Sequence, residues 1–179
     1  MDWTFDGGRR CLDLVNTLRS RHLAEGVELL TSPEALAEWL RLAGFAVDVV
    51  TSEDLATAIR LREAVDRLLT QPPDEADAAI VNQLAASPPP ARLVVDGGVL
   101  LREVSVPPDG VASALGAIAA DAVDLAPSEA PVRICSAEDC GLRFCDTSPR
   151  RTRQWCSMAR CGNRAKARAH YARVQVRNR

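Results

Sequence analysis

Aromatic residues, histidine and lysine are scarce in this chain of 179 residues. Aromatic side chains make up 4% of it, so a folded core must consist mainly of Leu, Val, Ile and Ala. Histidine occurs only at His22 and His170, and lysine only at Lys166. The sequence shows no nucleophile–base arrangement, no carboxylate pair at a clear spacing and no phosphate-binding glycine loop. These shortages argue against an enzyme.

Long apolar runs are absent as well. No stretch approaches the roughly 18 consecutive apolar residues that a membrane-spanning helix needs. The hydrophobic fraction of 47% is nevertheless that of a globular protein. The first residues include Asp2 and Asp6, where a signal peptide has a basic start followed by an apolar segment. We therefore expect a cytoplasmic protein that does not enter a membrane.

The charged residues are divided between an acidic part and a basic part. Residues 1–130 carry 10 arginines, no lysine and 21 acidic residues, a net charge of −11. Residues 131–179 carry 12 basic and three acidic residues, a net charge of +9. A basic end on an acidic body favours contact between that end and an anionic partner. A solvated tail, or one that docks on the acidic body, would have the same composition.

Local patterns predict helices over most of the acidic part. Apolar residues at helical spacing indicate helices near 10–18 and at 32–44, 51–69, 74–87 and 110–126. The helix at 32–44 has the clearest end signals, with Ser32 as N-cap, Pro33 in the first turn and Gly44 after its end. We expect Arg9, Asp13 and Asn16 to cap and turn the helix near 10–18, and a pocket formed near these residues is the alternative.

The remaining pattern in the acidic part is a hairpin, followed by a linker. Two strands are expected around Asp96-Gly97-Gly98, and "PSEAP" at 127–131 has the composition of a linker. We therefore predict an α+β fold with two domains. Residues 1–126 would form an acidic, mostly helical domain with a small antiparallel hairpin, which regulates or dimerises. Residues 132–179 would form a small finger that ends in a long basic helix.

Five of the six cysteines fall within 27 residues. In a reducing cytosol such a cluster is more often a metal site than a set of disulfides. Four of them form a symmetric frame, in which four residues separate Cys135 from Cys140, and four separate Cys156 from Cys161. Two such pairs typically enclose a tetrahedral Zn²⁺, and four thiolates leave no open position, so one structural zinc is expected. Disulfides and plain buried thiols are the alternatives.

Cys145 complicates this frame, because it follows Cys140 at the same spacing. On spacing alone, Cys140 and Cys145 could be the metal pair, with Cys135 spare. The stretch "CSAEDCG" is polar and turn-like, as a metal knuckle must be to aim both sulfurs inward. "LRFCDTS" instead alternates like a strand, which favours Cys145 as a small strand residue. The choice stays open at this point.

The stretch "WCSMARCGNRAKARAH" at 155–170 resembles the CGNR zinc finger, a bacterial family named for the tetrapeptide that begins here at Cys161. The resemblance extends over nearly all of 135–173. "FDGGRRCLDLVNTLRSR" and "LLTSPEALAEWLRLAG" are similar to the ABATE domain, which precedes this finger in its family. The resemblance implies a DNA-binding, stress-induced transcription regulator. It also implies that the zinc ligands are Cys135, Cys140, Cys156 and Cys161.

The basic residues after Cys156 are predicted to lie on one helix, because the run 157–176 is rich in Ala and Arg. We expect a treble-clef-like finger, in which a cysteine knuckle and a hairpin precede a helix that carries the last two ligands. Arg160, Arg164 and Arg168 recur every four residues and would form one cationic row. Like charges at this spacing repel, so the row favours an anionic partner. A helix fits the major groove of DNA, where Arg contacts guanine and Asn contacts adenine.

The candidate nucleic-acid contacts lie on this helix and on the segment before it: Arg150, Arg151, Arg153, Arg160, Asn163, Arg164, Lys166, Arg168, His170 and Arg173. Gly162 costs roughly 1 kcal/mol relative to alanine within a helix, which predicts a close approach to the metal loop or to a partner. We expect DNA as the partner, and a small-molecule effector or a second copy of the chain for the acidic domain. The alternative is a protein-interaction or RNA-binding module that uses the basic helix on an acidic partner.

Overall fold

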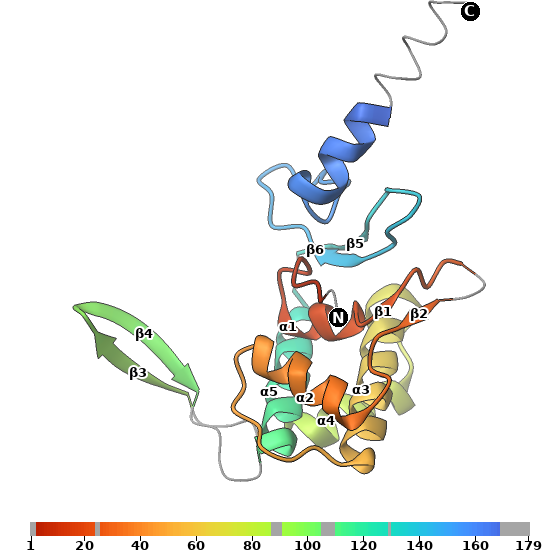
Figure 1. Cartoon of the computed structure of the whole chain (residues 1–179). Helices are drawn as coiled ribbons and strands as arrows, with labels where there is room; N and C mark the ends of the chain where they lie inside the picture. Colours follow the sequence, from red (N-terminus) through yellow and green to blue (C-terminus); the bar gives the residue numbers. More distant parts are fainter. Residues whose placement is uncertain (1–2, 24–25, 87–90, 105–109, 129, 169–179) are drawn as a thin grey trace, which may run out of the picture. The chain divides into compact units, whose positions relative to one another are not determined.

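The computed structural model describes residues 3–23, 26–86, 91–104, 110–128 and 130–168 (Figure 1). Contacts divide the chain into two compact units. Residues 29–128 belong to the first, which we call the helical unit. Residues 2–28 together with 129–179 belong to the second, which we call the finger unit.

The first two helices of the helical unit begin at capping residues. α2 (Pro33–Leu42) starts after Ser32, whose hydroxyl accepts a backbone hydrogen bond from the first turn at 3.3 Å. α3 (Ser52–Thr70) starts after Thr51, which forms a capping box with Asp54. Because such caps depend on neighbouring residues alone, these starts are among the features that the sequence predicts.

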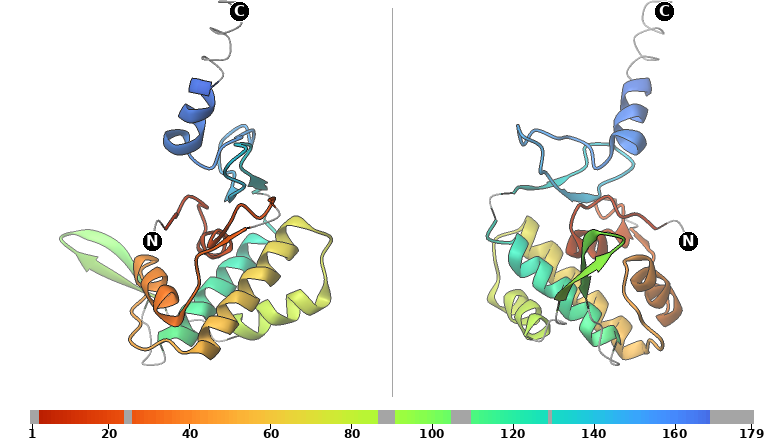
Figure 2. Two further views of the ribbon diagram at one scale, coloured as in Figure 1. Left: turned by 45° about the vertical axis from the view of Figure 1, so that its right-hand side comes forward. Right: turned by 90° about the vertical axis from the view of Figure 1, so that its left-hand side faces the viewer.

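α4 (Glu75–Ala85) and α5 (Gly110–Leu125) pack with α3 as three neighbouring helices (Figures 1 and 2). Arg67 of α3 donates to both carboxylate oxygens of Asp77 of α4, at 2.8 and 2.5 Å. These hydrogen bonds lower the pKa of Asp77 below its ordinary value, so the link between the helices stays charged at neutral pH. A hollow of about 200 Å³ between the three helices has an almost entirely apolar lining, which includes Val65.

The core of the helical unit is aliphatic apart from two aromatic residues of its N-terminal half. Trp39 and Phe45 are buried there. The other large side chains that are fully buried in this unit are Leu30, Leu36, Leu40, Leu61, Leu115, Ile118 and Leu125. This composition follows from the scarcity of aromatic residues.

β3 (Ala91–Asp96) and β4 (Val99–Val104) form the predicted antiparallel hairpin, drawn in green in Figure 1. Asp96 pairs with Val99 across Gly97 and Gly98. The two glycines have φ values of 55° and 81°, and a type I′ turn requires positive φ at both positions.

The finger unit contains elements from both ends of the sequence. Its first part consists of α1 (Arg10–Val15), β1 (Leu18–Arg19) and β2 (Val27–Glu28), with β1 and β2 antiparallel. Its second part consists of the antiparallel strands β5 (Val132–Ile134) and β6 (Arg143–Cys145), the π-helical turn η1 (Met158–Gly162) and a helical segment at 163–168. α1 packs against β6.

The predicted fold class is confirmed, since the structure combines helices with small antiparallel hairpins and a cluster of four cysteines. The contact-based units differ from the predicted division into 1–126 and 132–179, because residues 2–28 belong to the finger unit. As a statement about independently folding domains, that division stays a prediction. The predicted basic helix is present up to residue 168, and its continuation lies outside the described residues. Among the described helices, none is long and apolar enough to cross a membrane.

Candidate metal centre and basic helix

The first cysteine pair lies in the turn between β5 and β6. Cys135 follows β5, and its backbone N–H donates to the carbonyl of Leu142 at 2.8 Å. The N–H of Cys140 donates to the carbonyl of Ala137 at 3.0 Å and closes the turn. Gly141 has a φ of 65°, which turns the chain back into β6 without strain. The turn-like knuckle expected from "CSAEDCG" is therefore present.

The second pair belongs to the start of the basic helix. Cys156 lies two residues before η1, and Cys161 lies within it. The hydroxyl of Ser157 accepts from the N–H of Arg160 at 3.4 Å, and its carbonyl accepts from both Cys161 and Gly162 at 3.0 Å. The bond between Ser157 and Gly162 joins residues five positions apart, which is the hydrogen-bond pattern of a π-helix and widens the turn. This widening was not expected from the sequence, which predicts an ordinary helix with both ligands in it.

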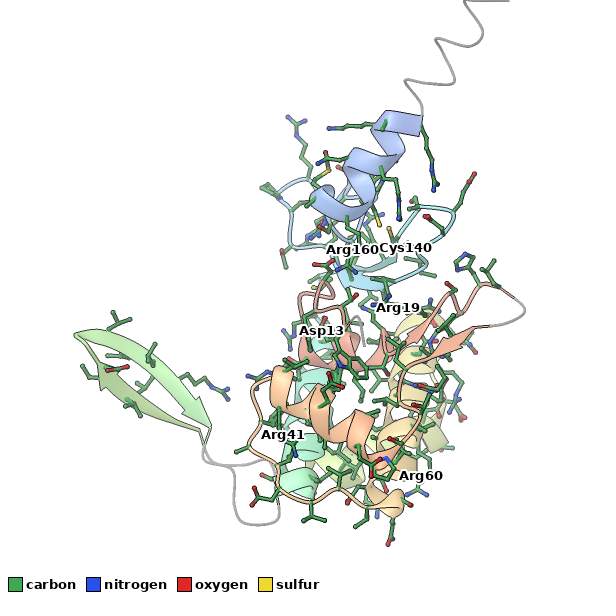
Figure 3. All side chains as sticks on the ribbon, viewed as in Figure 1. Asp13, Arg19, Arg41, Arg60, Cys140 and Arg160 are labelled. Atoms are coloured by element: carbon green, nitrogen blue, oxygen red, sulfur yellow. The ribbon has the colours of Figure 1, made fainter. Side chains whose placement is uncertain are left out.

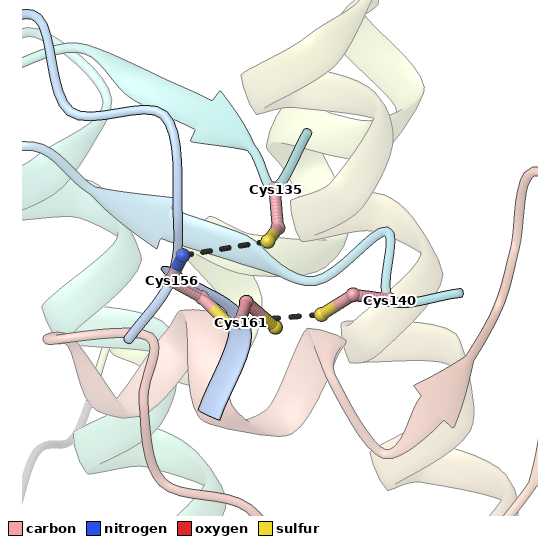
Figure 4. Close-up of side chains that lie close together, drawn as sticks. All are labelled: Cys135, Cys140, Cys156 and Cys161. Atoms are coloured by element: carbon pink, nitrogen blue, oxygen red, sulfur yellow. Dashed lines mark hydrogen bonds between the residues drawn. The ribbon is translucent and has the colours of Figure 1, made fainter. Parts of the chain in front are cut away.

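The four sulfur atoms form a buried cluster (Figure 4), in which all lie within 4.8 Å of one another. The sulfur of Cys156 is 3.7 Å from those of Cys140 and Cys161. A tetrahedral Zn²⁺ with Zn–S bonds of about 2.3 Å holds its sulfurs about 3.8 Å apart. A disulfide needs about 2.0 Å, and all these cysteines are free thiols. The cluster therefore fits one structural zinc.

The thiols of the cluster oppose one another's ionisation. The hydrogen bond from Cys156 lowers the pKa of Cys140 to about 5. The pKa of Cys156 is raised in turn, through its hydrogen bond to Cys140 and through burial, and burial raises the pKa of Cys161 to about 11. A first thiolate thus makes further thiolates unfavourable. A divalent cation at the centre reverses this effect, because it attracts every thiolate.

Within the described part of the chain, two N–H groups donate to sulfurs of the cluster. The backbone N–H of Cys156 donates to the sulfur of Cys135 at 3.5 Å, shown as a dashed line in Figure 4. The guanidinium of Arg164 donates to the sulfur of Cys161 at 3.6 Å. Such donors orient metal ligands and offset the negative charge of four thiolates. Arg164, the last residue of the CGNR tetrapeptide, therefore contacts the metal centre directly.

Cys145 lies apart from the cluster. It is buried in β6, and its backbone N–H donates to the carbonyl of Gly7 at 2.8 Å. Among the described residues, the one group of cysteine, histidine and acidic side chains placed to hold a metal is Cys135, Cys140, Cys156 and Cys161. These are the four cysteines of the predicted zinc site.

The side chains around the cluster form a small core. Leu142 and Phe144 are buried against the cysteines, and Trp155 packs at the edge. The guanidinium of Arg153 lies over the ring of Phe144, 4.9 Å from its centre. Arg153 also donates from Nε to the carbonyl of Trp155 at 2.7 Å. Apart from the four ligands, this core is small, so metal binding must supply much of the stability of the finger.

Comparison with known families agrees with this geometry. Residues 8–129 match the ABATE family, described as "Putative stress-induced transcription regulator". The chain belongs to this family. Residues 132–174 match the CGNR zinc finger, which confirms the resemblance of both parts. Neither is a family of enzymes, and no curated protein matches the chain.

The CGNR finger is bonded to the N-terminal segment through β6. The side chain of Asn16, 3% exposed, donates to the carbonyl of Arg143 at 2.9 Å and accepts from its N–H at 2.8 Å. Asn16 thus binds the residue before Phe144, and Gly7 binds the residue after it, Cys145. The N-terminal segment is therefore hydrogen-bonded to β6 at both neighbours of Phe144. Asn16 is the C-cap residue of α1, as expected, and its backbone N–H donates to the carbonyl of Leu12 at 2.9 Å. Its side chain in addition binds the finger, which the sequence did not predict.

Asp13 stabilises the turn before α1, as expected. Its Oδ1 accepts from the backbone N–H of Gly7 at 2.8 Å. A Cβ on Gly7 would meet this carboxylate and the side chain of Leu12 at 2.8 Å, so the turn requires glycine there. The carbonyl of Gly7 is thereby placed for its bond to β6.

A buried carboxylate organises the loop between β6 and Cys156. Oδ1 of Asp146 accepts from the N–H and the hydroxyl of Ser148, at 3.0 and 2.6 Å. Oδ2 accepts from the N–H of Arg153 at 2.9 Å and lies 3.0 Å from Nε of Arg133. Burial would raise the pKa of Asp146, but these hydrogen bonds and the charge of Arg133 lower it below its ordinary value.

The predicted nucleic-acid contacts have different surroundings in the CGNR finger. Five lie exposed on η1 and the helical segment after it: Arg160, Asn163, Arg164, Lys166 and Arg168. Arg150 and Arg151 are exposed on the loop before Cys156. Arg153 is half-buried and holds the core, as described above. His170 and Arg173 lie outside the described residues.

The cationic row has carboxylate partners within the finger unit. Arg164 and Arg168 donate to the two oxygens of Asp139, at 2.9 and 3.0 Å. Burial would raise the pKa of Asp139, but the hydrogen bond from Arg168 and the charges of both arginines lower it below its ordinary value. Arg160 is 3.4 Å from a carboxylate oxygen of Asp6. The sequence did not point to these partners.

Arg160 and Arg164 also line a polar hollow of about 310 Å³ beside the metal centre. Arg19, Cys140 and Arg160, labelled in Figure 3, contribute to its wall together with Asp139. The lining thus includes three arginines and one aspartate, and one of the arginines, Arg160, also has Asp6 as a neighbour. Its net charge suits a small anionic group.

The close approach expected at Gly162 is made by the side chain of Met158. A Cβ at this position would meet the sulfur of Met158 at 2.5 Å. Met158 belongs to the same π-helical turn, so this contact replaces the expected approach to the metal loop. Because the clash involves the far end of a flexible side chain, a small residue can be accommodated by a shift of Met158.

Proposed function

We propose that this chain is a zinc-dependent, DNA-binding transcription regulator that acts in the cytoplasm. One zinc would hold the CGNR finger, and the finger would present its cationic row to DNA. The observation that carries the proposal is a direct contact between the metal centre and the cationic row. Arg164, a member of this row, donates a hydrogen bond to the sulfur of Cys161. The ABATE domain would bind a small-molecule effector or a second copy of the chain.

The electrostatics of the finger support this proposal. Residues 131–179 carry a net charge of +9, and the described residues of the basic helix are mostly exposed. An exposed helix of this kind fits the major groove, with arginine and asparagine as base-reading side chains. The hollow lined by Arg19, Arg160 and Arg164 has the charge to hold a backbone phosphate at the end of that helix.

Arg168→Ala is expected to weaken DNA binding and to reduce its salt dependence. The loss of one phosphate contact lowers the slope of log K against log salt by about 0.9. Arg168 is the better target than Arg164, because Arg164 also touches a ligand sulfur. Mobility shifts of pooled genomic fragments at several salt concentrations measure the effect. Arg60→Ala, which removes an exposed arginine from the helical unit (Figure 3), serves as the control and should leave the slope unchanged.

Asp139→Asn is expected to tighten DNA binding about two- to fivefold, the range of one exposed ion pair. The carboxylate of Asp139 competes with DNA for Arg164 and Arg168, and the amide removes its charge. Glu138→Gln removes the same charge from the adjacent residue and serves as the control. Titration of one labelled duplex with the three proteins measures the difference. An equal gain in both variants would point to net charge alone and would contradict a competing role for Asp139.

The alternative function is a protein-interaction or RNA-binding module. Arg164 and Arg168 contact a carboxylate of the same chain, that of Asp139, which supports an acidic protein surface as the alternative partner. The mobility-shift experiment separates these functions. Absence of any shifted duplex at low salt with zinc loaded would reject DNA. Stronger competition by RNA than by duplex would favour the RNA-binding module.

A further inference from the structure

The β3–β4 hairpin exposes an unusual amount of apolar surface. Leu93, Val95, Val99, Leu100 and Leu101 are between 45% and 71% exposed. Each strand pairs only with the other among the described strands, so both strands have an open edge. An isolated two-stranded hairpin is marginally stable in water, and an open apolar edge favours pairing with another strand.

The register shows which backbone groups are available at the open edge of β3. Asp96 and Val99 flank the two-residue turn, and such a pair exchanges hydrogen bonds within the hairpin. Backbone groups alternate along a strand, so Val94 also faces β4. Leu93 and Val95 therefore direct their backbone N–H and C=O groups to the open edge.

The sequence of β3 is complementary to itself when a second copy lies antiparallel to it. With Val94 opposite Val94 of the second copy, Leu93 lies opposite Val95, and residue Arg92 lies opposite Asp96. A two-fold axis repeats both pairs. The opposed residues Leu93 and Val95 are those with backbone groups at the open edge, so the register also satisfies the hydrogen bonds.

Other two-fold pairings lack this match. A register centred on Leu93 or on Val95 separates residue Arg92 from Asp96 of the second copy. On β4, a register centred on Arg102 places this arginine opposite itself, and one centred on Leu101 places Leu100 opposite Arg102. Opposite charges across strands stabilise a pair and like charges destabilise it. The complementarity therefore selects the edge of β3 and the register centred on Val94.

We propose that two copies of this chain pair through their β3 edges into a four-stranded antiparallel sheet. Leu93 and Val95 lie on the same face of β3, because they are two positions apart, and Leu100 lies opposite Val95 on β4 and therefore shares that face. In the four-stranded sheet these three residues of both copies form one apolar face. The proposal rests on the part of the proposed function in which the ABATE domain binds a second copy, and it names the surface for that contact. The pairing involves neither zinc nor DNA, so its failure would leave the zinc-binding and DNA-binding parts of the proposed function standing.

A cysteine at the two-fold axis tests this pairing directly. Val94 and its counterpart form a non-hydrogen-bonded pair, in which Cα atoms are about 4.5 Å apart, within the range of a disulfide. Full-length, zinc-loaded Val94→Cys is expected to form a disulfide-linked dimer under mild oxidation. Leu100→Cys, 64% exposed on β4, is the control, because its counterpart would lie three strand spacings away, about 14 Å. Equal cross-linking of both variants, or of neither, would overturn the proposal.

Charge reversal tests the register without cross-linking. Asp96→Arg and Arg92→Asp should each weaken the homodimer about five- to tenfold in sedimentation equilibrium, because like charges then face each other. An equimolar mixture of the two variants should associate again, since opposite charges face each other in the mixed dimer. Circular dichroism and zinc content confirm that each variant is folded. A wild-type chain that stays monomeric over a wide concentration range would overturn the proposal, and so would variants that associate as the wild type does.

Discussion

Cys161→Ser is expected to abolish zinc binding and to unfold the CGNR finger. Cys161 is fully buried among the other three sulfurs, and a serine hydroxyl stays protonated at neutral pH and is a poor zinc ligand. The core of the finger consists largely of the ligands, with Leu142 and Phe144 as its main apolar side chains. Structural zinc contributes about 10 kcal/mol or more to the folding of small fingers, and this contribution would be lost.

The zinc content of the purified chain and the amide exchange of residues 132–168 measure this effect. Wild type should contain one zinc per chain and protect these amides, whereas Cys161→Ser should do neither. Cys145→Ser is the matched control, because it changes a buried cysteine of the same finger outside the cluster. It should retain one zinc. Loss of zinc in Cys145→Ser together with retention in Cys135→Ser would show that Cys145, and not Cys135, is the ligand.

Asn16→Ala is expected to lower the free energy of unfolding of the finger unit by about 2 to 4 kcal/mol. The substitution removes two hydrogen bonds and leaves the N–H and the C=O of Arg143 without these partners in a buried place. The cost is large because burying an unsatisfied polar group is more unfavourable than losing a solvent-exposed hydrogen bond. Urea unfolding monitored by tryptophan fluorescence measures it.

Asn82→Ala is the matched control for this prediction. Asn82 is exposed on α4, so its replacement should change stability by less than about 0.5 kcal/mol. Zinc should remain bound to Asn16→Ala in the absence of urea, since no ligand is changed. Equal stabilities of the two variants would contradict the view that the N-terminal segment supports the finger.

Features that depend on neighbouring residues could be predicted from the sequence. Ser32 and Thr51 cap helices through bonds to residues three positions later, and Gly97-Gly98 suits only a tight turn. The spacing of the cysteines belongs to the same class, because each pair occupies one short turn. The main helices were therefore predictable, and so was the zinc site, except that spacing alone did not decide between Cys135 and Cys145 and did not reveal the π-helical turn.

Features that depend on distant residues were not predictable in this way. Asn16 and Arg143 are 127 positions apart, and no local pattern connects them. The pairing of Asp139 with Arg164 and Arg168 depends on how the first turn of the basic helix meets the knuckle, which is a consequence of the metal geometry. The role of Arg153 depends on the ring of Phe144, which is distant in the local pattern, so its charge alone suggested a nucleic-acid contact.

We propose that zinc holds the finger in the form that binds DNA. Fluorescence anisotropy of a labelled duplex, titrated with zinc-loaded protein, with chelated protein and with protein reloaded with zinc, tests it most directly. We expect tight binding with a steep salt dependence in the loaded form, loss on chelation and recovery on reloading. Equal binding in all three forms, or no binding by the loaded form at low salt, would contradict the account.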